Sequence, residues 1–211
     1  MFYAVIAAAV LTGLLRGGRI TNLARVKLVY PWLAILSVAM DATLLLLIKY
    51  EFTVTQTMAF ISLSIQYALL FLFIWFNRYL PYSWLIGIGV FLNALVILIN
   101  GGSMPLAEAG AYLGKYEYAN QYLMEGKFIT YHIINENTKL WFLGDIIWFP
   151  PPFRVFMSIG DIILYAGAFL IIQNLIAAKS RRHKHPVFNR PIWRPHPQNT
   201  TGPITDTDRR I

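Results

Sequence analysis

The sequence is poor in charged residues and contains no cysteine. Of its 211 residues, 13% are Asp, Glu, Lys or Arg and 57% are hydrophobic, whereas ordinary soluble domains have roughly 25% charged residues. One small core cannot bury so many apolar side chains, so the composition favours an integral membrane protein. The absence of cysteine excludes a disulfide framework and a thiolate metal site.

The chain also lacks the short motifs of common catalytic sites. It contains no nucleophile elbow, His-Glu-x-x-His motif or phosphate-binding loop. His132, Asp145 and Asp161 could supply a general acid and base if they folded together, but nothing in their spacing requires it. The sequence therefore leans against an enzyme without excluding one. Flanking cations oppose a metal ion at His183 and His185, so neither a metal nor a cofactor is expected.

Five apolar segments are candidates for membrane helices. They cover residues 2–15, 31–48, 54–76, 83–99 and 157–178. The expected fold class is an all-α integral membrane protein with about five transmembrane helices. Whether the first segment crosses completely stays open, because at about 1.5 Å per residue it is shorter than the ~30 Å hydrocarbon core.

Basic residues predict the orientation of these segments. They follow every odd-numbered segment, as Arg16, Arg19, Arg25, Lys27, Arg78, Lys179, Arg181, Arg182 and Lys184. Because cytoplasmic loops are enriched in Lys and Arg, we expect the N-terminus outside and the C-terminus in the cytoplasm.

The remaining sequence divides into a loop and a tail. Residues 1–178 form the expected transmembrane helical domain, which includes an aromatic-rich outer loop at 100–156. Residues 179–211 form a basic, proline-rich cytoplasmic tail that is too polar to build its own core. Within the tail, arginines alternate with apolar side chains in a pattern typical of interface anchors. The predicted partner-binding residues are Phe188, Arg190, Ile192, Trp193 and Arg194.

The tetrapeptide Gly-Asp-Ile-Ile occurs twice, starting at Gly144 and at Gly160. In the second copy, Ser158 and Asp161 fit the Ser-x-x-Asp capping box, in which each side chain bonds a backbone N–H of the other residue. We expect this pair to begin the fifth helix. The first copy has no serine at the equivalent position and is expected to begin a short turn at the membrane surface.

Several polar residues lie inside the apolar segments. An ionised Asp41 in mid-span would cost at least about 2.5 kcal/mol, so it must be paired, protonated or exposed to water. The depths of the polar residues in their helices suggest one layer in the outer half of the bundle. Its predicted members are Asp41, Ser62, Gln66, Asn93 and Asn100. This layer either holds the helices together or binds the polar part of a ligand.

Three stretches resemble a known family: LLRGGRITNLARVKLVYPWLA, LINGGSMP and NTKLWFLGDIIWFPPPFRVFMSIGDIILYAG. In their Asn-Gly-Gly-x-Met-Pro and paired Leu-Gly-Asp and Ile-Gly-Asp motifs they are similar to small bacterial polytopic membrane proteins of unknown function. The resemblance extends from about Leu14 to Phe169. It implies a multi-pass protein of the bacterial plasma (inner) membrane and assigns no catalytic residue.

These observations favour a non-catalytic role. We expect an accessory or scaffolding subunit of a larger bacterial membrane assembly, with membrane lipids and a membrane-protein partner as its contacts. The alternative is a binding protein for a lipid, quinone or similar amphipathic ligand that occupies the polar layer. Charge alone gives no specificity for nucleic acid, so nucleic acid is not an expected partner.

Overall fold

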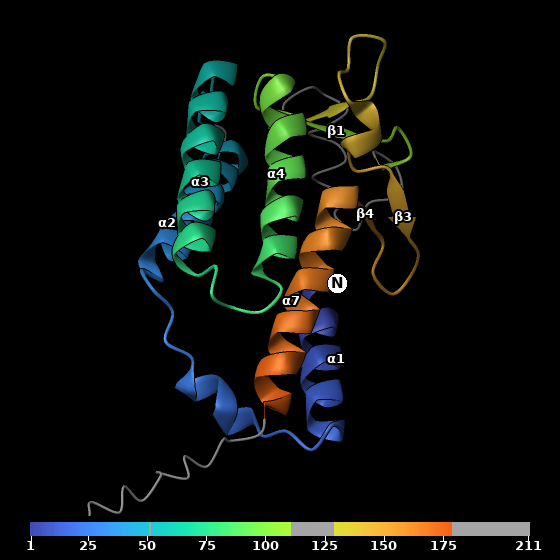
Figure 1. The fold of residues 1–211 in the computed structure, drawn as a ribbon. Helices are drawn as coiled ribbons and strands as arrows, with labels where there is room; N and C mark the ends of the chain where they lie inside the picture. The colour runs from blue at the N-terminus through green and yellow to red at the C-terminus, as the bar shows by residue number, and fades with distance from the viewer. Residues whose placement is uncertain (51, 111–128, 179–211) are drawn as a thin grey trace, which may run out of the picture. The chain divides into compact units, whose positions relative to one another are not determined.

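The computed structural model describes residues 1–50, 52–110 and 129–178 (Figure 1). The chain divides into a unit of Met1–Lys179 and a second unit of Ser180–Ile211, and the second lies outside the described residues. The helices of the first unit are α1 (Phe2–Leu15), α2 (Trp32–Lys49), α3 (Gln56–Phe76), α4 (Ser83–Ile99) and α7 (Ile159–Ala177), with short 3₁₀ turns η1 (Ile20–Arg25) and η2 (Trp141–Leu143).

The helices pack side by side in the order α2, α3, α4, α7 and α1, and α1 lies along the lower half of α7 in Figure 1. Each inner helix thus has two main neighbours. Small residues let the last pair approach closely: a Cβ added to Gly13 of α1 would lie 2.8 Å from the Cβ of Ile176. Small residues at such crossings are typical of helices that associate in lipid.

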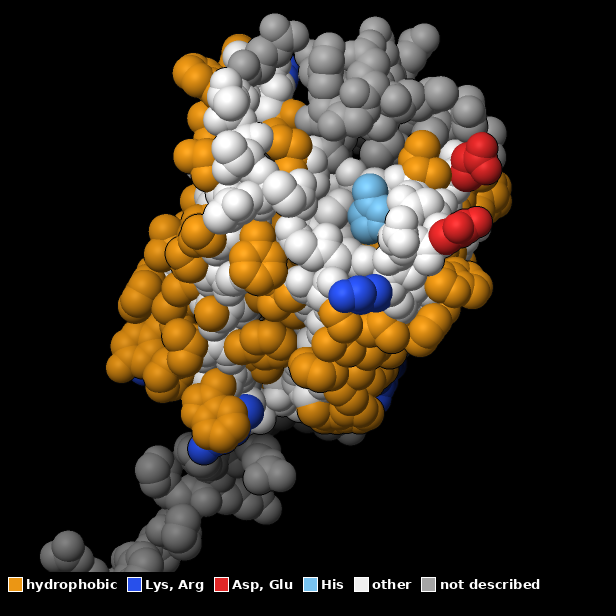
Figure 2. Space-filling view, turned by 90° about the horizontal axis from the view of Figure 1, so that it is seen from above, with side chains coloured by type: hydrophobic (Ala, Val, Ile, Leu, Met, Phe, Trp, Pro, Cys, Tyr) orange, Lys and Arg blue, Asp and Glu red, His pale blue; other side chains and the backbone are white. Residues whose placement is uncertain are grey.

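Apolar side chains cover the outside of this row (Figure 2). Trp84 and Phe91 of α4, for example, are 61% and 53% exposed. Among the described residues, three helices are long and apolar enough to cross a membrane, namely α2, α3 and α7. This indicates a membrane protein. The helices α1 and α4 are also apolar, but they have only 14 and 17 residues.

The described residues between α4 and α7, 100–110 and 129–158, form a small structure that we call the cap. It contains β1 (Met104–Leu106), β2 (Tyr131–Ile133), β3 (Ile147–Phe149) and β4 (Val155–Met157). The first two strands pair in parallel and the last two are antiparallel. The all-α expectation lacked these strands, because three residues are too few for a readable alternation of apolar and polar side chains.

The opposite end of α7 is held by the segment that follows α1. Asn22 donates from Nδ2 to the carbonyl oxygens of Ile176 and Ala178, each at 2.9 Å, and the Arg19 N–H donates to Ile176 O at 3.0 Å. These bonds satisfy carbonyl groups that a helix end leaves without partners. Asn77 plays a similar part between α3 and the segment before α2, since it exchanges two 2.9 Å hydrogen bonds with the backbone of Val29.

Candidate functional site

The helices α4 and α7 cross at two glycines. A Cβ added to Gly89 would lie 2.6 Å from Gly160 O, and one added to Gly160 would lie 2.0 Å from Asn93 Oδ1. Only hydrogen fits at either position, so the two backbones come into direct contact. This approach brings the beginning of α7 against the side chain of Asn93.

Asn93 joins the two helices through a closed set of hydrogen bonds. Its Nδ2 donates to Asp161 Oδ1 at 2.7 Å, and its Oδ1 accepts from Ser158 Oγ at 2.8 Å. The capping box is present at the same place: Asp161 N donates to Ser158 Oγ at 2.9 Å and Ser158 N donates to Asp161 Oδ2 at 3.3 Å. Because each polar group satisfies another, Asn93 acts here in helix packing.

Asp145, the aspartate of the first Gly-Asp copy, lies in the cap beside this network. Its backbone pairs with β1, since Asp145 N donates to Pro105 O at 2.8 Å and Ala107 N donates to Asp145 O at 3.1 Å. The residue is only 7% exposed, and its Oδ1 has no hydrogen-bond partner among the described residues. The expectation of a turn at the membrane surface therefore missed a buried carboxyl group.

The electrostatic environment of Asp145 is unfavourable for a negative charge. Burial raises the pKa of its carboxyl to about 8, the nearby charge of Asp161 adds to this effect, and a hydrogen bond from the Ser158 backbone opposes it. The Ser158 N–H thus acts on both carboxyl groups. The two Gly-Asp copies, sixteen residues apart in the sequence, meet at this N–H.

Two tyrosines adjoin the same carboxyl groups. Asp41, Asp145 and Asp161 all lie close enough to Tyr67 of α3 to act electrostatically on its hydroxyl. Tyr131 of β2 also lies within electrostatic reach of Asp145 and Asp161. The sequence analysis singled out the three aspartates separately and missed Tyr67, which has no local signal that separates it from a core tyrosine.

The predicted polar layer divides between two helix pairs. In α2 and α3, Asp41 and Gln66 form a hydrogen bond through their side chains. The other polar atom of Gln66, Oε1, is buried and has no hydrogen-bond partner among the described residues. The same is true of the Oγ of Ser37, a residue of α2 that is only 1% exposed. Asn93 instead belongs to the α4–α7 network described above. The ligand-binding role assigned to these residues stays a prediction.

A groove lies between α2, α3 and the turn that joins them, and we call it the α2–α3 groove. It has a volume of about 680 Å³. Its walls are mainly apolar, and Ser62 is the predicted site residue among them. The lining residues are Leu36, Ala39, Met40, Thr43, Leu44, Leu47, Phe52, Thr53, Val54, Met58 and Ser62.

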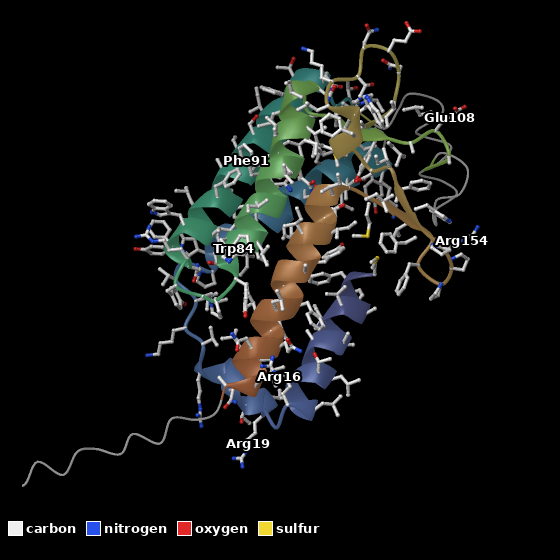
Figure 3. All side chains as sticks on the ribbon, turned by 45° about the vertical axis from the view of Figure 1, so that its right-hand side comes forward. Arg16, Arg19, Trp84, Phe91, Glu108 and Arg154 are labelled. Carbon is white, nitrogen blue, oxygen red and sulfur yellow. The ribbon has the colours of Figure 1, made fainter. Side chains whose placement is uncertain are left out.

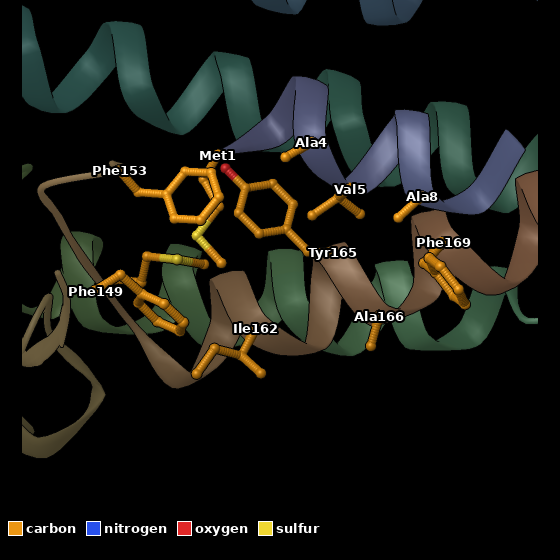
Figure 4. Close-up of a pocket in the computed structure, with 11 residues that line it drawn as sticks. Met1, Ala4, Val5, Ala8, Phe149, Phe153, Ile162, Tyr165, Ala166 and Phe169 are labelled. Atoms are coloured by element: carbon orange, nitrogen blue, oxygen red, sulfur yellow. The ribbon is translucent and has the colours of Figure 1, made fainter. Parts of the chain in front are cut away.

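A second, smaller groove of about 390 Å³ lies between α1, α7 and the β3–β4 hairpin (Figure 4). Its walls are almost entirely apolar, with Tyr165 of α7 as the residue that carries a polar group. The aromatic rings of Phe149 and Phe153 close one end in Figure 4. This groove offers little to orient a polar headgroup.

Two other sequence candidates anchor the cap. Asn100 donates to Lys139 O at 2.8 Å and accepts from Lys139 N at 2.9 Å, so it ties the end of α4 to the cap. His132 has Nδ1 2.8 Å from Ser103 Oγ and Nε2 3.2 Å from Thr138 Oγ1. Burial lowers the pKa of His132. Both ring nitrogens are engaged by hydroxyl groups, which suits a structural role.

Residues 179–211 lie outside the described residues. They include the predicted partner-binding residues and the histidines of the tail. No group of three or more His, Cys, Asp or Glu side chains that could hold a metal ion occurs in the described part of the chain. The candidate sites in the described residues are thus the network of carboxyl, amide and hydroxyl groups around Asn93 and Asp145, and the apolar α2–α3 groove.

Comparison with known proteins identifies the family. No curated protein and no solved structure matches the chain. A family model does match, over residues 25–173, and its description is a family of unknown function, DUF5317. The resemblance inferred from the sequence to a family of unknown function is thereby confirmed. Since the match covers more than half of the chain, this protein belongs to the DUF5317 family.

Proposed function

We propose that this protein binds an amphipathic ligand, of the lipid or quinone class, in the α2–α3 groove. The observation that carries the proposal is the groove itself, because about 680 Å³ lies within the 300–1,000 Å³ typical of small-molecule sites. Mainly apolar walls suit a hydrocarbon chain or ring. The hydroxyls of Thr43, Thr53 and Ser62 offer a few polar contacts among them.

The polar residues beside the groove support an amphipathic ligand over a purely apolar one. Gln66 lies one helical turn beyond Ser62 on α3, and it bonds Asp41 while its Oε1 has no partner. An unsatisfied buried oxygen costs free energy that a hydrogen-bond donor would recover. Gln66 does not itself line the groove, so the hydroxyl, amine or amide head of a ligand would supply that donor after the side chains that cover the oxygen move aside, while its chain fills the groove.

We further propose that the protein crosses the bacterial plasma membrane five times, with its N-terminus outside. Arg16 and Arg19 lie at the end of the molecule where α7 terminates, while Glu108 of the cap lies toward the other end (Figure 3). A reporter that is active only outside the cytoplasm should work when fused after Gly126 and be silent after Arg182. The opposite pattern would reverse the orientation.

The accessory-subunit role remains a second proposal. It depends on the composition of residues 186–211, where Trp193 and its neighbours carry the predicted contact. Truncation after Lys184 should leave the membrane helices inserted and release a partner protein that co-purifies with the full chain in mild detergent. If the same partners remain in the same ratio, the tail does not bind them.

Filling the groove tests the ligand-binding proposal. Ser62→Trp places an indole in the groove, whereas Ser64→Trp on the same helix changes a residue that does not line it. Mass spectrometry of organic extracts from the purified proteins should find one enriched lipid or quinone in the wild type and in Ser64→Trp, and its loss in Ser62→Trp. Equal amounts of that molecule in all three proteins, or none in the wild type, would contradict the proposal.

A further inference from the structure

The two Gly-Asp copies bring the carboxyl groups of Asp145 and Asp161 close together. Both face the backbone N–H of Ser158, at a distance of 3.3 Å for Asp161 Oδ2. Among the described residues, no positively charged side chain lowers the pKa of Asp145. Asp145 is more than nine-tenths buried, and its Oδ1 has no hydrogen-bond partner in the part of the chain that the structure describes. A buried ionised carboxylate with a like charge beside it is strongly disfavoured.

The two aspartates are not equivalent in this arrangement. The Asp161 carboxylate accepts hydrogen bonds from Asn93 Nδ2 and Ser158 N, and it lies at the N-terminal end of α7, where the helix dipole stabilises negative charge. Asp145 has the unpartnered oxygen and lies in the cap. When the environments of two neighbouring carboxyl groups differ in this way, a proton is favoured on the one with fewer hydrogen-bond donors, which here is Asp145.

We propose that Asp145 is a proton-binding site, in which the buried carboxyl group holds a proton beside the carboxyl group of Asp161. A proton needs no cavity, so it suits a residue packed as tightly as Asp145. The bound proton converts the unpartnered oxygen into a hydroxyl or leaves it as a neutral acceptor, and either form removes the buried charge. The exchange is a simple transfer between the carboxyl group and water.

The position of Asp145 couples this proton to the cap. Its backbone bonds to Pro105 and Ala107 hold the sequence before β3 against β1. Loss of the proton would place a second negative charge beside Asp161 and weaken the contact between the cap and α7. The pKa of about 8 places this change within a range that living cells encounter. Other titratable groups within electrostatic reach are Tyr67, Tyr131 and Tyr165.

Infrared spectroscopy of the full-length protein can detect the proton directly. A protonated carboxyl group has a C=O stretching band that a carboxylate lacks, so spectra are recorded from about pH 6 to about pH 10. We expect a band that disappears with a midpoint near 8 in the wild type. It should be absent from Asp145→Asn and retained in Asp41→Asn, which removes the half-buried carboxyl group of α2. In Asp161→Asn the midpoint should fall, because the neighbouring charge is gone.

Two results would overturn the proposal. One is a wild-type protein without a carboxylic acid band that titrates in this range. The other is a band that survives in Asp145→Asn and vanishes in Asp161→Asn, since the proton would then reside on α7. If Asp145→Asn does not fold, the wild-type titration and the shift in Asp161→Asn still decide the question, because a purely structural pair would show neither.

Discussion

The α4–α7 interface and the α2–α3 pair both place polar side chains on apolar helices, but they use them differently. Between α4 and α7, Asn93, Ser158 and Asp161 bond one another, and the backbones touch at Gly160. Between α2 and α3, polar atoms of Ser37 and Gln66 have no partner. A satisfied polar network fixes the position of two helices, whereas unsatisfied groups beside a groove leave hydrogen-bonding capacity for a ligand.

The largest expected effect comes from closing the α4–α7 contact. Gly160→Ala would place a methyl group 2.0 Å from Asn93 Oδ1, which must break the Asn93 network or separate the helices. We expect a loss of about 3 kcal/mol or more in the free energy of unfolding, because the overpacking adds to lost hydrogen bonds. Denaturant titration of the purified protein in detergent measures this loss.

The matched control is Gly87→Ala in α4, the helix that α7 contacts at Gly160. Its added Cβ would meet Ile74 Cγ2 at 3.7 Å, an ordinary van der Waals contact. Alanine favours the helical state over glycine by up to about 1 kcal/mol, so this variant should be unchanged or slightly more stable. Equal destabilisation by both variants would show that the close crossing at Gly160 has no special importance.

The next effect is a dependence of stability on pH. The pKa of Asp145 is raised from an ordinary value near 3.8 to about 8 in the folded protein. Between these values the folded state binds a proton that the unfolded state has released, so the free energy of unfolding should fall as the pH rises. The slope is at most about 1.4 kcal/mol per pH unit.

Asp145→Asn supplies the comparison for this pH dependence. The amide has the shape of the protonated carboxyl group and does not titrate, so most of the slope between pH 4 and pH 8 should disappear. Denaturant titrations at a series of pH values test this. A variant with the same slope as the wild type would assign the dependence to another group.

Removing the capping box tests the structural role of the second Gly-Asp copy. In Ser158→Ala combined with Asp161→Ala, the first N–H groups of α7 lose their acceptors, which should lower the free energy of unfolding by about 0.5–2 kcal/mol, and Asn93 also loses both of its side-chain partners, which should add to this loss. Ligand binding in the α2–α3 groove should be unaffected. A doubly substituted protein that is fully stable but has lost its bound ligand would contradict the structural role of the pair.

The positions of the helices could be predicted from the sequence because each helix coincides with a long, nearly uninterrupted run of apolar residues. The expected segment at residues 31–48 corresponds to Trp32–Lys49, and the one at 157–178 corresponds to Ile159–Ala177. Counting depth along each helix also identified Asp41 and Asn93 as polar residues of the bundle. It could not show that they belong to different helix pairs, because depth does not reveal which helices are neighbours.

Contacts between distant segments had no such signal. Asn22 bonds carbonyl groups more than 150 residues away, and β1 pairs with a strand that lies beyond residues 111–128. The burial of Asp145 depends on both the cap and α7. The sequence around Asp145 would be the same whether this loop residue were exposed or buried, so its environment could be known only from the fold.

A photo-crosslinking amino acid in α2 tests the ligand site most directly. Placed at Thr43, inside the α2–α3 groove, it should capture one lipid or quinone that is enriched over its share of the membrane. Placed at Val38, which is 66% exposed and outside the groove, it should capture the bulk lipids in their membrane proportions. The same bulk composition at both positions would contradict a specific ligand site in the groove.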